Sequence, residues 1–106
     1  MAKKIRVIIK RPDEEFGHVA FISDSLKNLQ KTVEGYIEMV SFSKDITIIC
    51  NEDGKLLGLP YNCTICGTDF VGTLIFAGGD ACDGFKDLSI SFKDYKKLFF
   101  GDNNSK

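Results

Sequence analysis

Cysteine is the residue type in this chain best suited to metal or redox chemistry, and it occurs at four positions: Cys50, Cys63, Cys66 and Cys82. Four thiolates can hold a structural zinc ion in a tetrahedron, but zinc ribbons place their cysteines in two closely spaced pairs. Here only Cys63 and Cys66 have that spacing. Cys50 falls in phase with Ile46 and Ile48, where a thiol serves as a small apolar side chain. We therefore predict no metal ligand and no cofactor, and keep a structural zinc-binding domain as one alternative.

Redox and acid–base chemistry are also disfavoured. A thioredoxin-like cysteine pair opens a helix that follows a strand, whereas Cys66 leads into a strand-like run. His18 is the single histidine, and catalysis there would need a nucleophile or carboxylate brought beside it by the fold. The acidic run 13–15 is typical of a solvated turn, and Gly78-Gly79-Asp80 lacks the spacing of a phosphate loop and predicts a turn. We expect no catalytic residue and a protein that is not an enzyme.

Length and charge restrict the classes of partner. The 106 residues show no change of composition, which predicts a single domain over residues 1–100 and a flexible polar tail over residues 101–106. The formal net charge of −1 offers no broad basic surface for nucleic acid. Lysines stand beside aromatic rings at 95–100, but the rings have the spacing of a helix packed on a core. With no export signal and no apolar run of roughly 18 residues, we expect a cytoplasmic protein that contacts neither a membrane nor nucleic acid.

The first third of the chain reads as two strands and a helix. Apolar residues alternate with basic ones over residues 5–9, the pattern of a half-buried strand, and residues 18–22 form a weaker second strand. Asp24 or Ser25 can cap a helix in which Leu26, Leu29 and Val33 share one face. Gly35 is expected to end this helix in the left-handed conformation.

The remainder reads as a series of strands and a closing helix. Residues 36–42 and 45–50 predict a hairpin, Asp53-Gly54 predicts a turn, and residues 55–59 predict a third strand that ends at Pro60. Residues 70–77 predict another strand, with Gly72 as a weak point or a bulge. Ser91 and Asp94 match a helix capping box, which is followed by an apolar face containing Phe92, Tyr95 and Phe99.

This order of elements predicts the fold class. Strands that run together between separate helices favour an α+β fold over alternating strands and helices. We expect an antiparallel or mixed sheet of about four to six strands, with one packed central helix and a C-terminal helix.

Several short motifs resemble an uncharacterised family of small domains carried by phages, plasmids and integrated mobile elements, mostly of Gram-positive bacteria. The similarity extends from about Asp24 to Phe99. The motifs are Gly35-Tyr36-Ile37-Glu38, Cys50-Asn51-Glu52-Asp53-Gly54-Lys55-Leu56, Gly58-Leu59-Pro60 with Asn62, Cys66-Gly67-Thr68, and a segment over residues 88–95 that opens the last helix.

The resemblance implies a mobile-element setting, in which small proteins without catalytic residues often bind a host protein. We therefore expect an accessory factor whose partner is a host protein, with inhibition of a defence effector such as a CRISPR nuclease as the specific form. A small-molecule or nucleotide-binding module is the main alternative. Much of the signature can be explained by turns and helix ends, so we predict that binding is carried by its polar members, taken to be exposed: Asn51, Glu52, Lys55 and Asn62.

Overall fold

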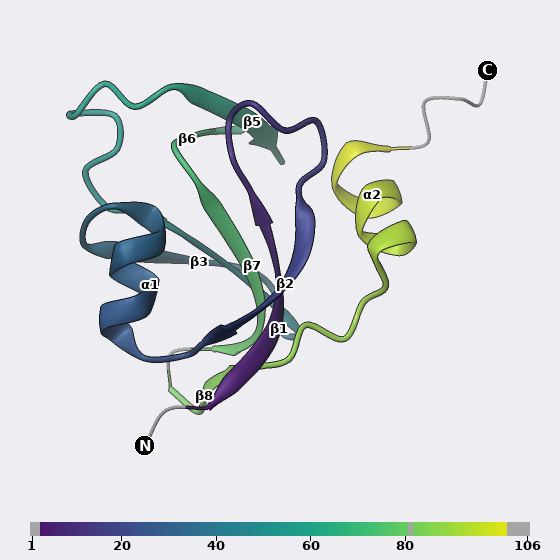
Figure 1. Ribbon diagram of the computed structural model, residues 1–106. Coiled ribbons are helices and arrows are strands. Elements are labelled where there is room, and N and C mark those ends of the chain that lie inside the picture. The colour runs from purple at the N-terminus through teal and green to yellow at the C-terminus, as the bar shows by residue number, and fades with distance from the viewer. Residues whose placement is uncertain (1–2, 81, 102–106) are drawn as a thin grey trace.

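The computed structural model describes residues 3–80 and 82–101 and confirms the α+β fold (Figure 1). Its elements in chain order are β1 (Lys4–Lys10), β2 (His18–Ser23), α1 (Leu26–Val33), β3 (Ile37–Ser43), β4 (Ile46–Asn51), β5 (Tyr61–Ile65), β6 (Thr68–Val71), β7 (Leu74–Asp80), β8 (Gly84–Lys86) and α2 (Phe92–Phe100). None of the helices in the described ranges is long and apolar enough to cross a membrane. The predicted tail lies outside these ranges except for Gly101, whose N–H closes α2 by donating to the Lys97 carbonyl at 3.0 Å.

The described strands form two antiparallel sheets. The larger has six strands in the order β2-β1-β7-β4-β3, with β8 pairing the second half of β7, and the smaller is the β5–β6 hairpin. The predicted hairpin of β3 and β4 is confirmed, with a bulge between Ser41 and Ser43. The weaker strand at residues 18–22 is confirmed as β2, which pairs with β1 over its whole length.

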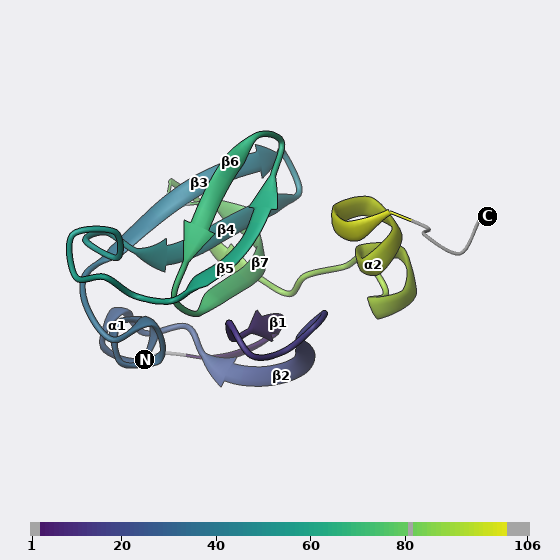
Figure 2. The same cartoon turned by 90° about the horizontal axis from the view of Figure 1, so that it is seen from above.

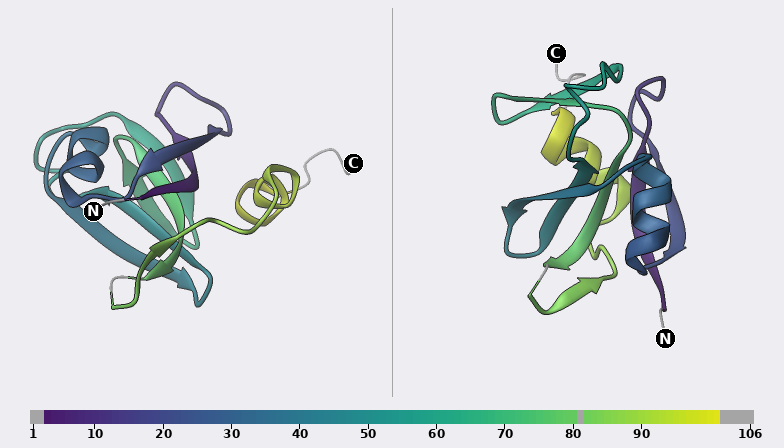
Figure 3. Two further views of the ribbon diagram at one scale, coloured as in Figure 1. Left: turned by 60° about the horizontal axis from the view of Figure 1, so that its bottom comes forward. Right: turned by 90° about the vertical axis from the view of Figure 1, so that its left-hand side faces the viewer.

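The large sheet is covered on both faces. On one face Leu29 and Val33 of α1 pack on Val7 and Ile9, while Leu26 is exposed rather than buried as predicted. On the other face the β5–β6 hairpin and α2 cover Ile8, Ile48 and Phe76, among others. Figure 2 shows α2 beside the sheet, and the right-hand view of Figure 3 shows α1 and the β5–β6 hairpin on opposite sides of it. Period-two alternation along each strand divides the apolar residues between these two cores.

The helix ends show one correction. Ser25, not Asp24, caps α1: its Oγ accepts the Asn28 N–H at 3.2 Å. The left-handed residue after α1 is Glu34, with φ of 66°, whereas the prediction placed Gly35 there. Glycine is required at position 35 for a different reason, because a Cβ there would lie 2.6 Å from the Asn51 amide nitrogen.

The C-terminal helix is as predicted. Ser91 caps α2 by accepting the Asp94 N–H at 3.1 Å. Tyr95 is fully buried and meets Phe76 edge to face with ring centroids 5.0 Å apart. Its hydroxyl donates to the Phe16 carbonyl at 2.7 Å, so α2 is held against the β1–β2 loop as well as the sheet.

Two strand predictions are wrong. Residues 55–58 form turns and Leu59 lies in irregular structure, so this segment is not a third strand. The predicted strand over residues 70–77 is divided into β6 and β7, because Gly72 has a φ of +75° and turns the chain there. The sequence also gave no prediction for β5 or β8, and Gly78-Gly79-Asp80 lies within β7 and pairs with β8 rather than forming a turn.

Candidate functional site

Asn51, the last residue of β4, fixes the start of the loop over residues 52–59. The Asn51 side-chain oxygen accepts the Asp53 N–H at 2.8 Å. Its amide nitrogen donates to the Val33 carbonyl at 3.0 Å and the Glu34 carbonyl at 3.1 Å, two groups that the end of α1 leaves without helical partners. Asn51 is therefore buried, with 5% of its surface exposed, and joins the loop to α1.

Short hydrogen bonds and packing give loop 52–59 a defined shape. The Leu57 N–H donates to the Asp53 carbonyl at 2.9 Å, and the Leu59 N–H donates to the Gly54 carbonyl at 3.0 Å. Leu59 packs so closely on Gly72 that a Cβ there would lie 2.8 Å from the Leu59 side chain. The loop thus presents two large apolar side chains to solvent, Leu56 with 89% of its surface exposed and Leu57 with 61%.

Asn62 has a structural position in β5. Its side-chain oxygen accepts the buried Lys10 ammonium at 2.7 Å, and its amide nitrogen donates to the carbonyls of Lys10 at 2.8 Å and Gly72 at 2.7 Å. Asn62 and Lys10 are both more than nine-tenths buried. The expectation that Asn51 and Asn62 are exposed is therefore wrong. Glu52 and Lys55 are exposed as expected.

A groove runs between β3 and β6 next to loop 52–59. Its first part, here called the acidic cavity, has a volume of about 230 Å³ and is lined by four carboxylates and one lysine among other residues: Glu38, Glu52, Asp53, Asp69 and Lys55. Its second part, the apolar cavity, has about 320 Å³ and is lined mainly by apolar side chains, including Phe42, Ile48 and Ile65. Val40, Thr68 and Phe70 line both parts, so the two cavities are adjacent.

Burial is the main influence on the pKa values of the two buried thiols, Cys50 and Cys63. Burial, together with the negative charge of Glu38, raises the pKa of the Cys50 thiol to about 11, although the positive charge of Lys55 acts in the opposite direction. Burial likewise raises the pKa of Cys63. Both thiols are therefore neutral at pH 7, the opposite of the lowered pKa that activates a cysteine nucleophile or metal ligand.

The cysteines do not form a metal site in this fold. Cys50 and Cys63 are buried, whereas Cys66 and Cys82 are exposed. Cys66 and Gly67 are the two turn residues of the β5–β6 hairpin, with φ of 50° and 80°. Across residues 3–80 and 82–101, no group of three or more His, Cys, Asp or Glu side chains is placed to hold a metal ion.

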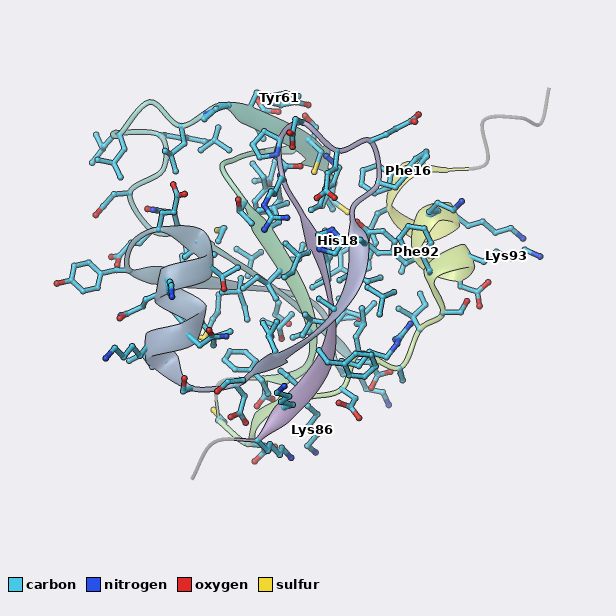
Figure 4. All side chains as sticks on the ribbon, viewed as in Figure 1. Phe16, His18, Tyr61, Lys86, Phe92 and Lys93 are labelled. Carbon is cyan, nitrogen blue, oxygen red and sulfur yellow. The ribbon has the colours of Figure 1, made fainter. Side chains whose placement is uncertain are left out.

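His18 lies on β2, at the other edge of the large sheet from the groove. Its Nδ1 is 2.8 Å from a carboxylate oxygen of Glu14. Burial raises the pKa of that carboxyl, but hydrogen bonds from the Arg11 N–H and from His18 outweigh burial and lower it. Figure 4 shows Phe16, His18 and Phe92 gathered near α2, away from loop 52–59.

The lysines and rings of the last helix pack against each other. The Lys96 ammonium lies 5.3 Å from the centroids of both Phe16 and Phe92, while Phe99 contacts Phe76 and Tyr95 in the core. These contacts agree with an amphipathic helix packed on the domain. Lys10, another basic residue that could have met phosphates, is buried beneath Asn62.

Residues 5–100 match the family model described as Domain of unknown function (DUF3846). The chain belongs to the DUF3846 family. Neither a curated protein nor a solved structure shows significant similarity to it. The match covers nearly the whole described chain of this DUF3846 protein, including the groove and loop 52–59.

Three of the four predicted binding residues, Asn51, Glu52 and Lys55, line the acidic cavity, whereas Asn62 does not. Sequence reasoning missed the other groove residues, notably Glu38 and Asp69, which are distant in sequence from the loop. It also missed Leu56 and Leu57. Their signal was present as an apolar pair directly after a turn, but the pair was assigned to a strand.

Proposed function

We propose that this DUF3846 chain is a non-enzymatic accessory protein that acts in the cytoplasm of a bacterial host by binding a host protein. The observation that carries the proposal is the exposed Leu56–Leu57 pair at the tip of a well-defined loop, directly beside a groove. Exposed apolar groups that adjoin a polar rim are characteristic of protein-binding surfaces. The binding surface is loop 52–59 together with the groove.

The energetics of the loop support this role. Fully burying a leucine side chain contributes roughly 1.5–3 kcal/mol, so two leucines at the centre of an interface can supply roughly 3–6 kcal/mol. Because Asn51 and Leu59 already hold the loop in place, little ordering of the backbone opposes binding.

The charges around the groove weigh against the nucleotide-binding alternative. Four acidic residues and one lysine line the acidic cavity. Such a surface repels phosphate groups and attracts a partner with basic residues. The structural zinc alternative finds no support in the positions of the four cysteines, two buried and two exposed.

The family resemblance of the sequence motifs implies a mobile-element setting, so a defence effector such as a CRISPR nuclease is the first partner to test. The similarity to small phage and plasmid domains supports this choice by association. Inhibition would then result from occupation of a surface that the effector needs, without any reaction catalysed by this chain.

The test uses purified effectors and a matched set of variants. Each effector is titrated against the wild-type protein, against Leu56→Ser/Leu57→Ser, and against Leu26→Ser, which changes a comparably exposed leucine on α1. We expect binding that the double variant weakens at least 100-fold and Leu26→Ser leaves unchanged. Equal binding by all three proteins would refute the assignment of the surface. Failure of every candidate from the host, tested as a purified protein, would refute the proposed function.

A further inference from the structure

The β6 strand has one edge that faces the groove. In the described part of the chain β6 pairs only with β5. The two are joined by the two-residue turn Cys66-Gly67, and in such hairpins the flanking residues, here Ile65 and Thr68, form a hydrogen-bonded pair. Pairs alternate along an antiparallel ladder, so the next residue of β6, Asp69, directs its N–H and carbonyl away from β5. These groups are directed toward the place of a neighbouring strand.

The β5–β6 hairpin covers only part of the face of the large sheet on which it packs. Phe70 is buried together with its cross-strand partner Cys63, whereas Asp69 is exposed on the opposite side. Beyond β6, Val40 and Phe42 of β3 are only partly buried, and both line the groove. The two-stranded sheet therefore covers only part of the face beneath it and leaves room for a third strand.

The two cavities have a fixed order along this edge. The acidic cavity is lined by Glu38 near the start of β3 and by Val71 at the end of β6. The apolar cavity is lined by Phe42 near the end of β3 and by Ile65 and Cys66, which lie just before β6 in the chain. β3 and β6 thus run in opposite directions along the groove, and the cavities differ by one step of two residues along β3.

We propose that the partner protein contributes an extended segment that adds to β6 as a third, antiparallel strand. The residue opposite Asp69 points outward, because paired residues share a face. The residue before it lies opposite Phe70 and enters the acidic cavity, and the residue after it lies opposite Thr68 and enters the apolar cavity. The segment therefore carries a basic residue, then any residue, then a large apolar residue, in that order. This inference rests on the proposed function.

Charge and spacing both support this occupant. A lysine or arginine side chain in the acidic cavity is attracted by Glu38, Glu52 and Asp53, the acidic lining residues other than the outward-pointing Asp69. Along β3, the acidic cavity is lined by Glu38 and Val40 and the apolar cavity by Val40 and Phe42, so the two cavities are offset by two residues. Two residues of a strand span about 6.7 Å, and the basic and apolar residues of the segment are separated by the same spacing. An antiparallel addition also gives the more stable ladder. The outward-pointing residue accounts for the unrestricted middle position.

Synthetic peptides test the proposal without disturbing the fold. Peptides of about nine residues carry arginine-serine-leucine at their centre, the reversed order leucine-serine-arginine, or a neutral glutamine in place of arginine. Fluorescence anisotropy measures their affinity for the full chain. We expect the first order to bind at least tenfold more tightly than the other two, with an affinity that falls as salt increases.

Backbone methylation of the peptide separates strand addition from simple charge attraction. Methylating the serine nitrogen removes the N–H that pairs with the Asp69 carbonyl and should weaken binding about tenfold. Methylating the nitrogen of the following leucine, whose N–H points away from β6, is the matched control and should have an effect several-fold smaller. Glu38→Gln should weaken binding about threefold, whereas the remote variant Glu15→Gln should not.

The outcomes distinguish this inference from the proposed function. If both peptide orders bind equally, or if both methylated positions are equally tolerated, strand addition to β6 is wrong. If no peptide binds but a purified host protein still binds in a manner that requires Leu56 and Leu57, only this inference is overturned. If neither peptides nor host proteins bind, both proposals are overturned.

Discussion

The contact between Lys10 and Asn62 gives the most demanding prediction for the stability of this domain. Lys10 is 3% exposed and its ammonium donates to the Asn62 side-chain oxygen at 2.7 Å. The perturbation is Asn62→Leu, which keeps the branching and the number of side-chain heavy atoms but removes this acceptor. It also removes the amide that donates to the carbonyls of Lys10 and Gly72.

The expected cost follows from the three lost hydrogen bonds. A hydrogen bond to a charged group contributes about 1.5–3 kcal/mol, and each bond to a neutral carbonyl contributes about 1 kcal/mol. Asn62→Leu should therefore lower the free energy of unfolding by about 4 kcal/mol. Adding Lys10→Met removes the buried charge that the first substitution left without its acceptor, so the double variant should recover about 2 kcal/mol.

Equilibrium urea denaturation of the two single variants, the double variant and the wild type completes a double-mutant cycle. We expect a coupling energy of at least about 2 kcal/mol between the two positions. Lys4→Met at the exposed start of the same strand is the control and should change stability by less than about 0.5 kcal/mol. Additive effects of Lys10→Met and Asn62→Leu would refute the reasoning, because the buried ammonium would then not depend on Asn62.

Three further predictions concern a glycine, a carboxyl and the thiols. Gly72→Ala should lower the free energy of unfolding by about 1–3 kcal/mol in urea denaturation, because φ is +75° and the new methyl would meet Leu59; an unchanged midpoint would contradict this. Glu14 has a lowered pKa in the folded state. Its contribution to the free energy of unfolding is therefore present above the ordinary carboxyl pKa and is lost as the pH falls through the pKa of the folded state. Glu14→Gln should lower the melting temperature at pH 7 and have little effect near pH ~2. An equal change at both pH values would exclude the linkage. In the folded protein at about pH 8, a maleimide should react quickly with two thiols and slowly with the other two, as resolved by peptide mass spectrometry; the fast pair should be Cys66 and Cys82, and the slow pair Cys50 and Cys63.

Local patterns were sufficient to predict several elements. The alternation in β1, the capping Ser91, the restriction of the first helix cap to Asp24 or Ser25, and the apolar face around Tyr95 all involve residues at most a few positions apart. Their physical causes, namely side-chain direction and satisfaction of terminal N–H groups, act over the same short range. These predictions therefore did not depend on knowing what each element packs against.

Residues whose role depends on distant contacts were assigned wrongly. Asn62 lies two residues after Pro60 and resembles an exposed polar residue, but it is buried by partners up to 52 positions away in sequence. Asn51 resembles a turn residue and indeed begins one, yet its amide also caps a helix that ended 18 positions earlier. The Leu56–Leu57 pair resembles a strand because its apolar character dominates the local pattern, although the loop hydrogen bonds hold it in turns.

The sequence by itself determined the fold class, both helices, the N-terminal cap of the second helix, the β3–β4 hairpin and the charged residues near position 52. Each of these depends on periodicity or on chemistry between near neighbours. Only the tertiary structure decided that Glu38, Asp69 and loop 52–59 surround one groove, and that β6 presents an edge to it. A groove of this kind is formed by segments that are far apart along the chain, and their juxtaposition is fixed by the packing of the β5–β6 hairpin on the large sheet.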